Sequence, residues 1–295
     1  MFTKDFQKDD KKNNTIINGK INFHTHSSFC DGKNTPEELI HSAIEKGFSI
    51  LGFSSHSIYP FAEKWHISPN EHYHYVEHIK QLMQKYQNEI KILCGFEVDF
   101  LPPYSQLQVN QFEDFEPDYL IGAVHYVSNN NGYFAIDDSI ENIKKGITQV
   151  FKGDGKACIC EYFKTQREMI STGRFNIIAH PDLPRKRNNF LHFFDETETW
   201  YKEQITETVR TIAKTNLVVE INTGAIARGV MDDVYPSQYF LEKLYEAKVP
   251  ICINSDCHNA PQLDAAFDKA QSIAKKIGYK ELIYPTFKEE FIVKL

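Results

Sequence analysis

The sequence of 295 residues has no long hydrophobic run, no internal repeat and no low-complexity segment. Residues 1–20 are polar and rich in lysine, and they lack the apolar stretch that a secretory signal peptide or a membrane span requires. We therefore expect a flexible N-terminal leader over residues 1–20, a single domain over residues 21–295 and no membrane contact. The chain as a whole is 41% hydrophobic and 25% charged, which is typical of a globular protein.

Organised cysteines and an excess of positive charge are also missing. The six cysteines do not follow the spacing of a small secreted disulfide framework, so we expect reduced thiols and a cytoplasmic protein. Cys158 and Cys160 resemble half of a zinc site, but no second thiol pair lies at a matching spacing. The formal net charge of −7 argues against general nucleic-acid binding, although a local basic pocket could still bind a phosphate.

Short apolar runs alternate with helical patterns along most of the chain. This alternation predicts parallel strands and an α/β fold, a (β/α) barrel of about seven strands. The expected strands are residues 21–23, 48–53, 91–98, 119–124, 175–179, 217–221 and 249–254. The expected helices are residues 36–46, 68–88, 138–149, 158–171, 203–214, 236–247 and 263–277, before a short apolar end. We interpret residues 129–172 as a loop-and-helix excursion beside the active site.

Histidine and acidic side chains follow six of these seven runs. His24 and His26 are one residue apart, so on a strand they would point to the same side. Taken singly, a histidine at a strand end is most often only a polar residue there. In a barrel, however, the carboxyl ends of the strands share one rim, and six occupied positions favour a metal site. The candidates are His24, His26, His56, Glu97, His125, His180, Asp256 and His258.

Eight such side chains exceed what one tetrahedral zinc ion needs, so two or three divalent ions fit better. A carboxylate such as Glu97 can bridge two ions, and ions that share a water can turn it into hydroxide near neutral pH. These are the catalytic groups that a phosphoester hydrolase needs. Two alternatives are weaker: a scaffold without metals should have apolar residues at these positions, and an amidohydrolase usually has a carboxylated lysine where this chain has Glu97.

The ordered pieces resemble the polymerase-and-histidinol-phosphatase (PHP) superfamily and, within it, the histidinol-phosphate phosphatases of the HisJ/HisK type. They span nearly the whole chain, from about residue 21 to residue 260. The matching pieces are His24-Thr25-His26, Asp31, His56, Gly95-Phe96-Glu97, Ala123-Val124-His125, Ala179-His180-Pro181-Asp182, Glu220-Ile221-Asn222-Thr223 and Asn254-Ser255-Asp256-Cys257-His258.

The resemblance implies a distorted (β/α)7 TIM-like barrel with three metal ions at the C-terminal rim of the strands. The first ion would be bound by His24, His26, Glu97 and Asp256, the second by Glu97, His125 and His180, and the third by Asp31, His56 and His258. Asp31 also has a plain interpretation as the first residue of an Asp-Gly turn. Many family members have an acidic residue just before His56, and this chain has Ser55, which can still hydrogen-bond an imidazole.

The resemblance further implies a small phosphate ester as substrate. Arg185 and Arg228 are the candidates for binding its phosphate, with Lys186 or Arg187 as alternatives to Arg185 and a solvated basic loop as the competing interpretation. Asp182 and His258 are the catalytic candidates, Asp182 either orienting the His180 ring or protonating the leaving group. Glu220 and Asn222 are expected to line the barrel interior. The remaining histidines are expected in a helix or on the surface: His41, His66, His72, His74, His78 and His192.

The expected activity is hydrolysis of L-histidinol phosphate to L-histidinol and phosphate, a step of histidine biosynthesis, by attack of a metal-bridging hydroxide. The alternative is a PHP-family phosphoesterase that acts on another small phosphomonoester or a nucleotide. Because mixtures of His, Asp and Glu suit Zn, Fe and Mn alike, the sequence leaves the metal open. It also leaves the oligomeric state open.

Overall fold

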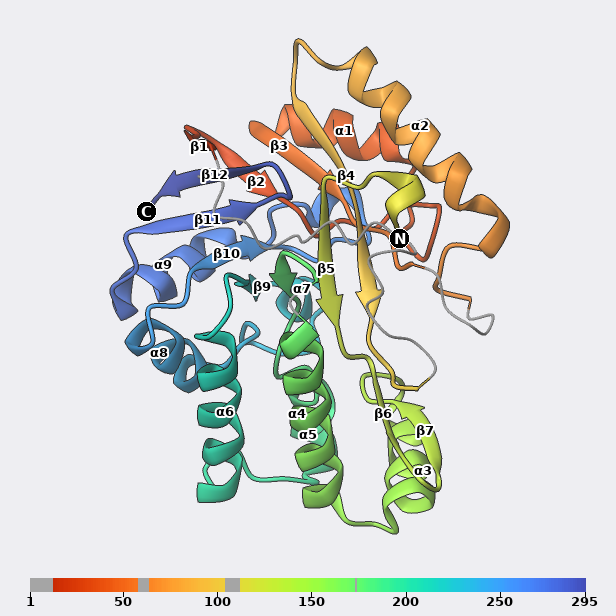
Figure 1. Cartoon of the computed structure of the whole chain (residues 1–295), viewed down its shortest axis with the longest axis vertical. Helices are drawn as coiled ribbons and strands as arrows, with labels where there is room; N and C mark the ends of the chain where they lie inside the picture. The colour runs from red at the N-terminus through yellow and green to blue at the C-terminus, as the bar shows by residue number, and fades with distance from the viewer. Residues whose placement is uncertain (1–12, 58–63, 104–111, 173) are drawn as a thin grey trace, which may run out of the picture.

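The computed structural model describes residues 13–57, 64–103, 112–172 and 174–295. Seven parallel strands form one sheet in the order β10-β9-β8-β5-β4-β3-β2 (Figure 1). These strands are β2 (Lys20–Asn22), β3 (Phe48–Phe53), β4 (Lys91–Asp99), β5 (Tyr119–Ala123), β8 (Ile177–Ile178), β9 (Val218–Asn222) and β10 (Ile251–Asn254). The seven predicted strands are therefore present, the fifth as two residues only.

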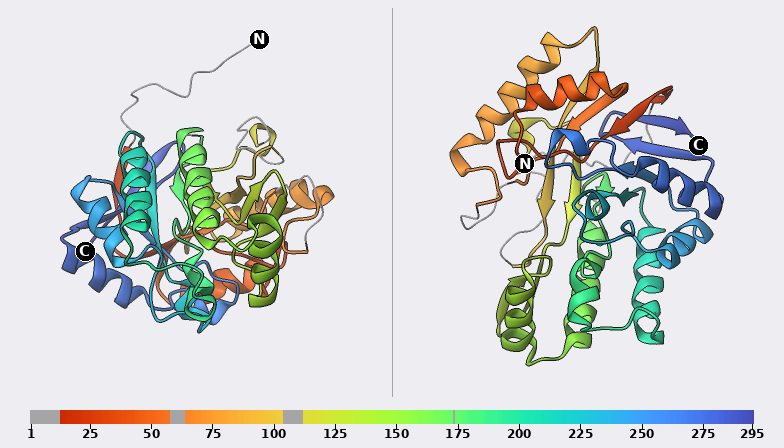
Figure 2. Two further views of the ribbon diagram at one scale, coloured as in Figure 1. Left: turned by 90° about the horizontal axis from the view of Figure 1, so that it is seen from below. Right: turned by 180° about the vertical axis from the view of Figure 1, so that it is seen from behind.

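Helices connect these strands. Seven of them lie where the sequence pattern predicts, with shifted ends, whereas residues 185–191 and 224–227 form two short helices that were not predicted. The helices are α1 (Pro36–Glu45), α2 (His72–Lys85), α3 (Ile140–Phe151), α4 (Gly155–Thr172), α5 (Arg185–Leu191), α6 (Thr199–Ile212), α7 (Gly224–Ala227), α8 (Gln238–Glu246) and α9 (Phe267–Ile277). Short 3-10 turns lie at η1 (Pro69–Glu71), η3 (Glu113–Phe115) and η4 (Ala260–Gln262). Figures 1 and 2 show α1 and α2 side by side along β3 and β4. None of the helices in these ranges has the length and apolarity of a membrane span.

The sheet closes into a barrel at its carboxyl end. A parallel bridge joins Thr25, just after β2, to Cys257, just after β10. The His26 backbone N–H donates to the Cys257 carbonyl at 2.8 Å, and the Cys257 N–H donates to the His24 carbonyl at 3.2 Å. The predicted seven-stranded barrel is thus confirmed, and its closing contact lies among the predicted metal ligands.

Tyr119 of β5 fills the barrel interior. Its hydroxyl is directed at the carbonyl oxygens of Phe23 (2.5 Å) and Phe53 (3.0 Å), on the two strands beyond its neighbour β4. Gly52 and Gly95 leave the space for this ring, because a Cβ at either position would lie within 2.6 Å of a Tyr119 atom. The side chain therefore ties three strands together beneath the rim.

A second sheet, β1-β12-β11, covers the barrel at the end opposite the rim, and it corrects the expectation for part of the leader. β1 (Asn13–Ile16) pairs in parallel with β12 (Glu289–Lys294), so residues 13–20 are not a loose leader; residues 1–12 lie outside the described residues. The short apolar end that follows the last predicted helix forms β11 (Glu281–Pro285) and β12. Tyr284 and Phe291 of this sheet pack edge-on against Phe23 of the barrel.

The predicted excursion over residues 129–172 contains a hairpin as well as helices. β6 (Tyr126–Asn129) and β7 (Gly132–Ala135) pair antiparallel and lead into α3 and α4. Figure 1 shows this group at the end of the molecule toward which β4 and β5 run. The excursion therefore stands beside the rim, where it can form a wall of the site.

We expect Tyr119→Phe to lower the free energy of unfolding by about 1–3 kcal/mol, because two buried carbonyl groups lose their donor. Urea denaturation followed by circular dichroism measures this change. The control is Tyr245→Phe, whose side chain is exposed and whose effect should stay within about 0.5 kcal/mol. A loss in Tyr119→Phe no larger than in the control would contradict the role of the hydroxyl.

Candidate metal centre

The barrel brings all nine predicted metal ligands together at its rim. Each side chain lies at or just beyond the carboxyl end of a strand, except Asp31, which comes from the loop between β2 and α1. Most are almost fully buried, whereas Asp31 and His258 are partly exposed. The set is His24, His26, Asp31, His56, Glu97, His125, His180, Asp256 and His258.

Glu97 of β4 lies at the centre of the set, with imidazoles on both of its oxygens. Its Oε2 lies 3.1 Å from His24 Nε2, 3.4 Å from His26 Nε2 and 3.0 Å from His56 Nδ1. Its Oε1 lies 3.1 Å from His180 Nε2 and 3.5 Å from His125 Nε2. The two oxygens of one carboxylate thus face two different groups of nitrogens, which is the geometry of a bridging ligand.

A further group of potential ligands forms beside His26. His258 Nε2 lies 3.2 Å from Asp31 Oδ2, and His56 Nε2 lies 4.0 Å from Asp31 Oδ1. The loop before α1 folds tightly onto the rim, since a Cβ at Gly32 would lie 2.6 Å from the His26 backbone. This close approach needs glycine and places Asp31 against the histidines. His56 presents one nitrogen to Glu97 and the other to Asp31.

Asp256 lies beside His24 and His26, two of the histidines that face Glu97 Oε2. Its Oδ1 lies 3.2 Å from His26 Nε2 and 3.7 Å from His24 Nε2. The Asp256 backbone has a left-handed φ of 50°, which aspartate tolerates better than most residues. The neighbouring Thr25–Cys257 bridge holds this backbone conformation in place.

Carboxylates behind the ligands fix two of the rings. His24 Nδ1 contacts Glu220 at 2.9 Å, and His125 Nδ1 contacts Asp99 at 2.5 Å. When Nδ1–H donates to a carboxylate, Nε2 keeps its lone pair for the cluster. We predicted Glu220 only as a lining residue and missed Asp99. Asp99 lies two residues after Glu97 on the same strand, and so on the same face, and this spacing could have identified it.

The cluster fits divalent metal ions. His24 Nε2, His26 Nε2, His56 Nδ1 and Glu97 Oε2 are buried and have no hydrogen-bond partner among the described residues. Burying such atoms unsatisfied costs about 1–3 kcal/mol each, which argues for a missing partner. Three groups of donor atoms are close enough to share an ion each: His24, His26 and Glu97; His56, Glu97 and His125; and His26, Asp31, His56 and His258.

Burial and neighbouring charges shift the pKa values of the groups in the cluster. Burial would raise the pKa of the Glu97 carboxyl, but the imidazoles of His24, His56 and His125 hold this pKa well below its usual value. Burial and the neighbouring rings of His258 and His56 lower the pKa of His26 to about 3, which leaves a neutral imidazole. In contrast, Asp99 and Glu97 outweigh burial and raise the pKa of His125 to about 10.

An open pocket of about 890 Å³ leads to the cluster. Its floor includes Glu97, His125, His180 and His258, and one wall comes from the segment between Tyr126 and Val150. The basic residues in its lining are Lys64, Lys145, Lys186 and Arg228. A buried set of metal-type ligands therefore opens onto a space large enough for a small molecule.

Arg228 lines this pocket as predicted, whereas Arg185 does not. Arg185 begins α5, and its guanidinium is engaged by Glu196 (2.8 Å), Asp233 (2.8 Å) and the Val234 carbonyl (3.0 Å). Its side chain is buried in these contacts, so the prediction that Arg185 binds phosphate is corrected. The next residue, Lys186, is the one that faces the pocket, where it pairs with Asp137 at 2.7 Å.

The contacts of Asp182 also differ from those that its predicted role requires. Its carboxylate accepts the Ser237 backbone N–H at 2.7 Å and lies 3.6 Å from Arg185, and it is completely buried. Burial raises the pKa of this carboxyl to about 6. Within the described ranges it makes no hydrogen bond to the His180 ring, and it is not part of the pocket lining. Its contacts are those of a structural residue that anchors the start of α8.

His66, in contrast, lies closer to the site than expected. We predicted it outside the site, yet it is buried with Nε2 3.2 Å from Asp99 Oδ2. His72 is likewise buried, between Phe96 and Phe115, without a place in the cluster. His74 remains exposed on α2, as predicted.

Comparisons with known proteins agree with this geometry. The family model described as "PHP domain" matches residues 22–224. A protein of Schizosaccharomyces pombe described as a probable histidinol-phosphatase is 27% identical over 281 residues, which cover 89% of this chain and 88% of that protein.

Two solved structures share the fold. The structure of hisK from Listeria monocytogenes superposes with a TM-score of 0.77 at 20% identity, covering 85% of this chain and 99% of that chain. The structure of the Lactococcus lactis histidinol phosphate phosphatase, complexed with Zn, L-histidinol and phosphate, has a TM-score of 0.67 at 20% identity. That match covers 92% of this chain and 98% of the Lactococcus chain.

We expect zinc binding to the chelator-treated protein to release protons at pH 7. The raised pKa values of His24, His56 and His125 mean that these rings hold protons in the absence of an ion, and ligation must displace them. The apparent affinity should therefore rise with pH, by about tenfold per pH unit for each proton released. Calorimetry in buffers of different ionisation enthalpy counts the protons. Zinc binding without proton release would show that the cluster is neutral before it is loaded.

Proposed function

Since the chain belongs to the PHP domain family, we propose that it is a metal-dependent phosphomonoesterase that hydrolyses L-histidinol phosphate to L-histidinol and phosphate. One observation carries this proposal: a cluster of metal-type ligands and two cationic side chains, Lys186 and Arg228, share one pocket. Metal ions and fixed cations together are what a phosphoryl group needs to be bound and attacked.

We assign the ligands to two or three divalent ions, with Zn, Fe and Mn as candidates. His24, His26, Glu97 and Asp256 form the first set, and Glu97 with His125 and His180 forms the second. Asp31, His56 and His258 form the third. The support for the division is that Glu97 Oε2 faces His24 and His26, whereas Oε1 faces His125 and His180. Oε2 also lies 3.0 Å from His56 Nδ1, so Glu97 borders the third set as well. Bound ions would neutralise phosphoryl oxygens and lower the pKa of the attacking water.

Lys186 and Arg228 bind the phosphate in this proposal. Arg228 donates to the Asp256 carboxylate at 3.0 Å and to the Asp256 carbonyl at 2.9 Å, which fixes its guanidinium beside the cluster. Asp137 holds the Lys186 ammonium at 2.7 Å. His258 lies between these cations and the cluster; its side chain is 21% exposed, so it can meet both an ion and the substrate. Asp182 and Arg185 have no part in the chemistry.

The wall of the pocket suits an organic group that carries an imidazole and an ammonium. Trp65, Tyr126, Tyr133 and Phe134 provide flat apolar surfaces, and Asp137 and Asp138 provide negative charge. The relatives described as histidinol-phosphatases, and the Lactococcus structure with L-histidinol and phosphate, give the specific substrate. The alternative substrate class is another small phosphomonoester, which the same cations and ligands would accept.

We expect the metal-replete protein to release phosphate from L-histidinol phosphate much faster than from AMP, a sugar phosphate or p-nitrophenyl phosphate. The double variant His24→Ala/His26→Ala should lose this activity, because two ligands of the first set are gone. A phosphate-release assay measures both. Activity on the other esters but not on histidinol phosphate would refute the substrate, and inactivity on all four esters would refute the phosphatase itself.

We expect Lys186→Gln to raise KM for the phosphate ester by about 10–100-fold, because one charge-assisted hydrogen bond contributes about 1.5–3 kcal/mol. Arg187→Gln is the matched comparison, since Arg187 is partly exposed, donates to the Asp138 carbonyl at 3.2 Å and is not part of the pocket lining. Steady-state kinetics separates KM from kcat. A larger KM change in Arg187→Gln than in Lys186→Gln would reverse the assignment.

A further inference from the structure

The Asp99 carboxylate lies between two imidazoles that come from different loops. Its Oδ1 is 2.5 Å from His125 Nδ1, and its Oδ2 is 3.2 Å from His66 Nε2. His125 follows β5, whereas His66 belongs to the long connection between β3 and α2. Asp99 itself ends β4 and is 2% exposed. One buried carboxylate therefore joins a predicted metal ligand to a loop of the pocket.

On the first side, Asp99 determines which nitrogen of His125 faces the cluster. With Nδ1–H donated to Asp99, Nε2 is the nitrogen that faces the cluster, 3.5 Å from Glu97 Oε1, and it can bind an ion once its proton is displaced. A rotated ring would turn this nitrogen away from the second set of ligands. Carboxylates in this position behind a ligating histidine commonly change metal affinity by about 10–100-fold when they are removed.

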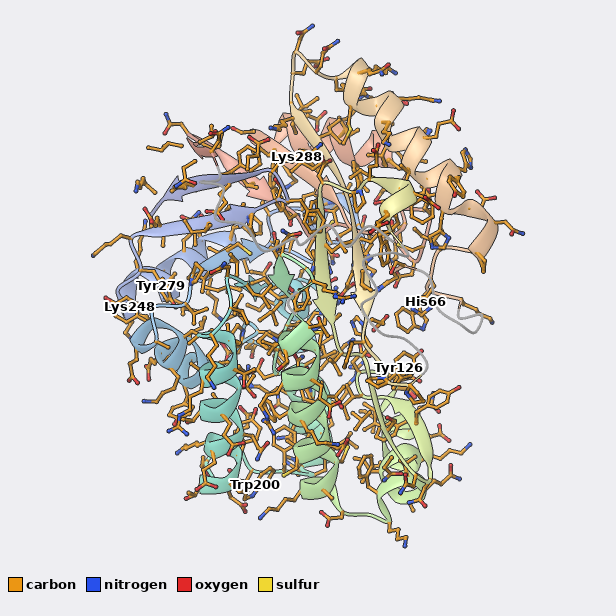
Figure 3. All side chains as sticks on the ribbon, viewed as in Figure 1. His66, Tyr126, Trp200, Lys248, Tyr279 and Lys288 are labelled. Carbon is orange, nitrogen blue, oxygen red and sulfur yellow. The ribbon has the colours of Figure 1, made fainter. Side chains whose placement is uncertain are left out.

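On the second side, His66 supports Trp65. The two rings overlap with centroids 3.8 Å apart, and Trp65 stacks on Tyr126 at 5.9 Å with an interplanar angle of 16°. The Trp65 ring also meets His56 edge-on at 4.7 Å. Trp65 and Tyr126 both line the pocket, and Figure 3 shows His66 and Tyr126 on the same side of the molecule. The aromatic wall is thus anchored to β4 through His66 and Asp99.

We propose that Asp99 is a positioning residue with two functions: it holds His125 in its metal-binding orientation, and through His66 it holds Trp65 against the substrate pocket. This inference rests on the proposed function, because it assigns His125 to the second metal position and Trp65 to the substrate wall. The two functions are separable, because Oδ1 of Asp99 faces His125 and Oδ2 faces His66.

The experiment compares Asp99→Asn and His66→Phe in a Trp200→Phe background, which leaves Trp65 as the only tryptophan. Trp200 lies at the start of α6, far from His66 (Figure 3). Asp118→Asn is the matched control, because Asp118 is a half-buried aspartate that accepts the Cys94 backbone N–H at 2.8 Å and precedes β5, at the opposite end of the barrel. Zinc affinity is measured by competition with a chromophoric chelator, together with Trp65 emission, KM and kcat.

Asp99→Asn should lose about 10–100-fold in the affinity for one zinc ion and should shift the Trp65 emission. His66→Phe should keep the zinc affinity, shift the emission and raise KM with little change in kcat. Zinc affinity in Asp99→Asn equal to that in Asp118→Asn would overturn the first function. Unchanged emission and KM in His66→Phe would overturn the second. Zinc affinity and Trp65 emission are measured without substrate. An inactive wild-type protein would therefore refute the phosphatase activity, whereas these two measurements would still test the role of Asp99.

Discussion

The buried carboxylate of Glu97 determines what the rest of the site must provide. Glu97 is 1% exposed, and no lysine or arginine of the described residues is paired with it. A carboxylate buried in this way is stable only if positive charge surrounds it. Five imidazoles lie within 3.5 Å of the Glu97 carboxylate. The rings of His24, His56 and His125 have raised pKa values and supply positive charge in the free protein, and all five rings can act as ligands of shared ions. Further carboxylates, such as Glu220 behind His24, then fix the orientation of the rings. The barrel keeps these groups in place because they come from the carboxyl ends of neighbouring strands, with His24 and His26 both following β2.

Much of this arrangement could be predicted from the sequence. Parallel strands of a barrel end at one rim, so a histidine after a short apolar run has a defined position even when nothing else about the loop is known. This is why His24, His56, His125 and His180 meet although they are far apart in the chain. Asp31 was predicted through the family resemblance, whereas the adjacent Gly32 favoured a plain turn; in the structure this glycine allows the loop to fold onto the rim.

Other parts depend on tertiary contacts that no local pattern encodes. Arg185 and Lys186 are adjacent in a basic run, and only the packing of α5 decides that Arg185 turns to Glu196 and Asp233 while Lys186 turns to the pocket. His66 precedes a helix like several surface histidines, and its carboxylate partner Asp99 lies on another strand. β1 lies at the start of the described chain and pairs with β12 at its other end, and a four-residue exposed strand such as β1 is not stable without a partner.

The most direct test of this account is a crystal structure of the zinc-loaded protein with anomalous difference density measured at the zinc edge. The account predicts at least two peaks, one on each side of the Glu97 carboxylate, within about 2.0–2.2 Å of histidine nitrogens from the first and second sets. A single peak, or peaks that do not contact Glu97, would contradict the bridging role on which the proposed chemistry depends.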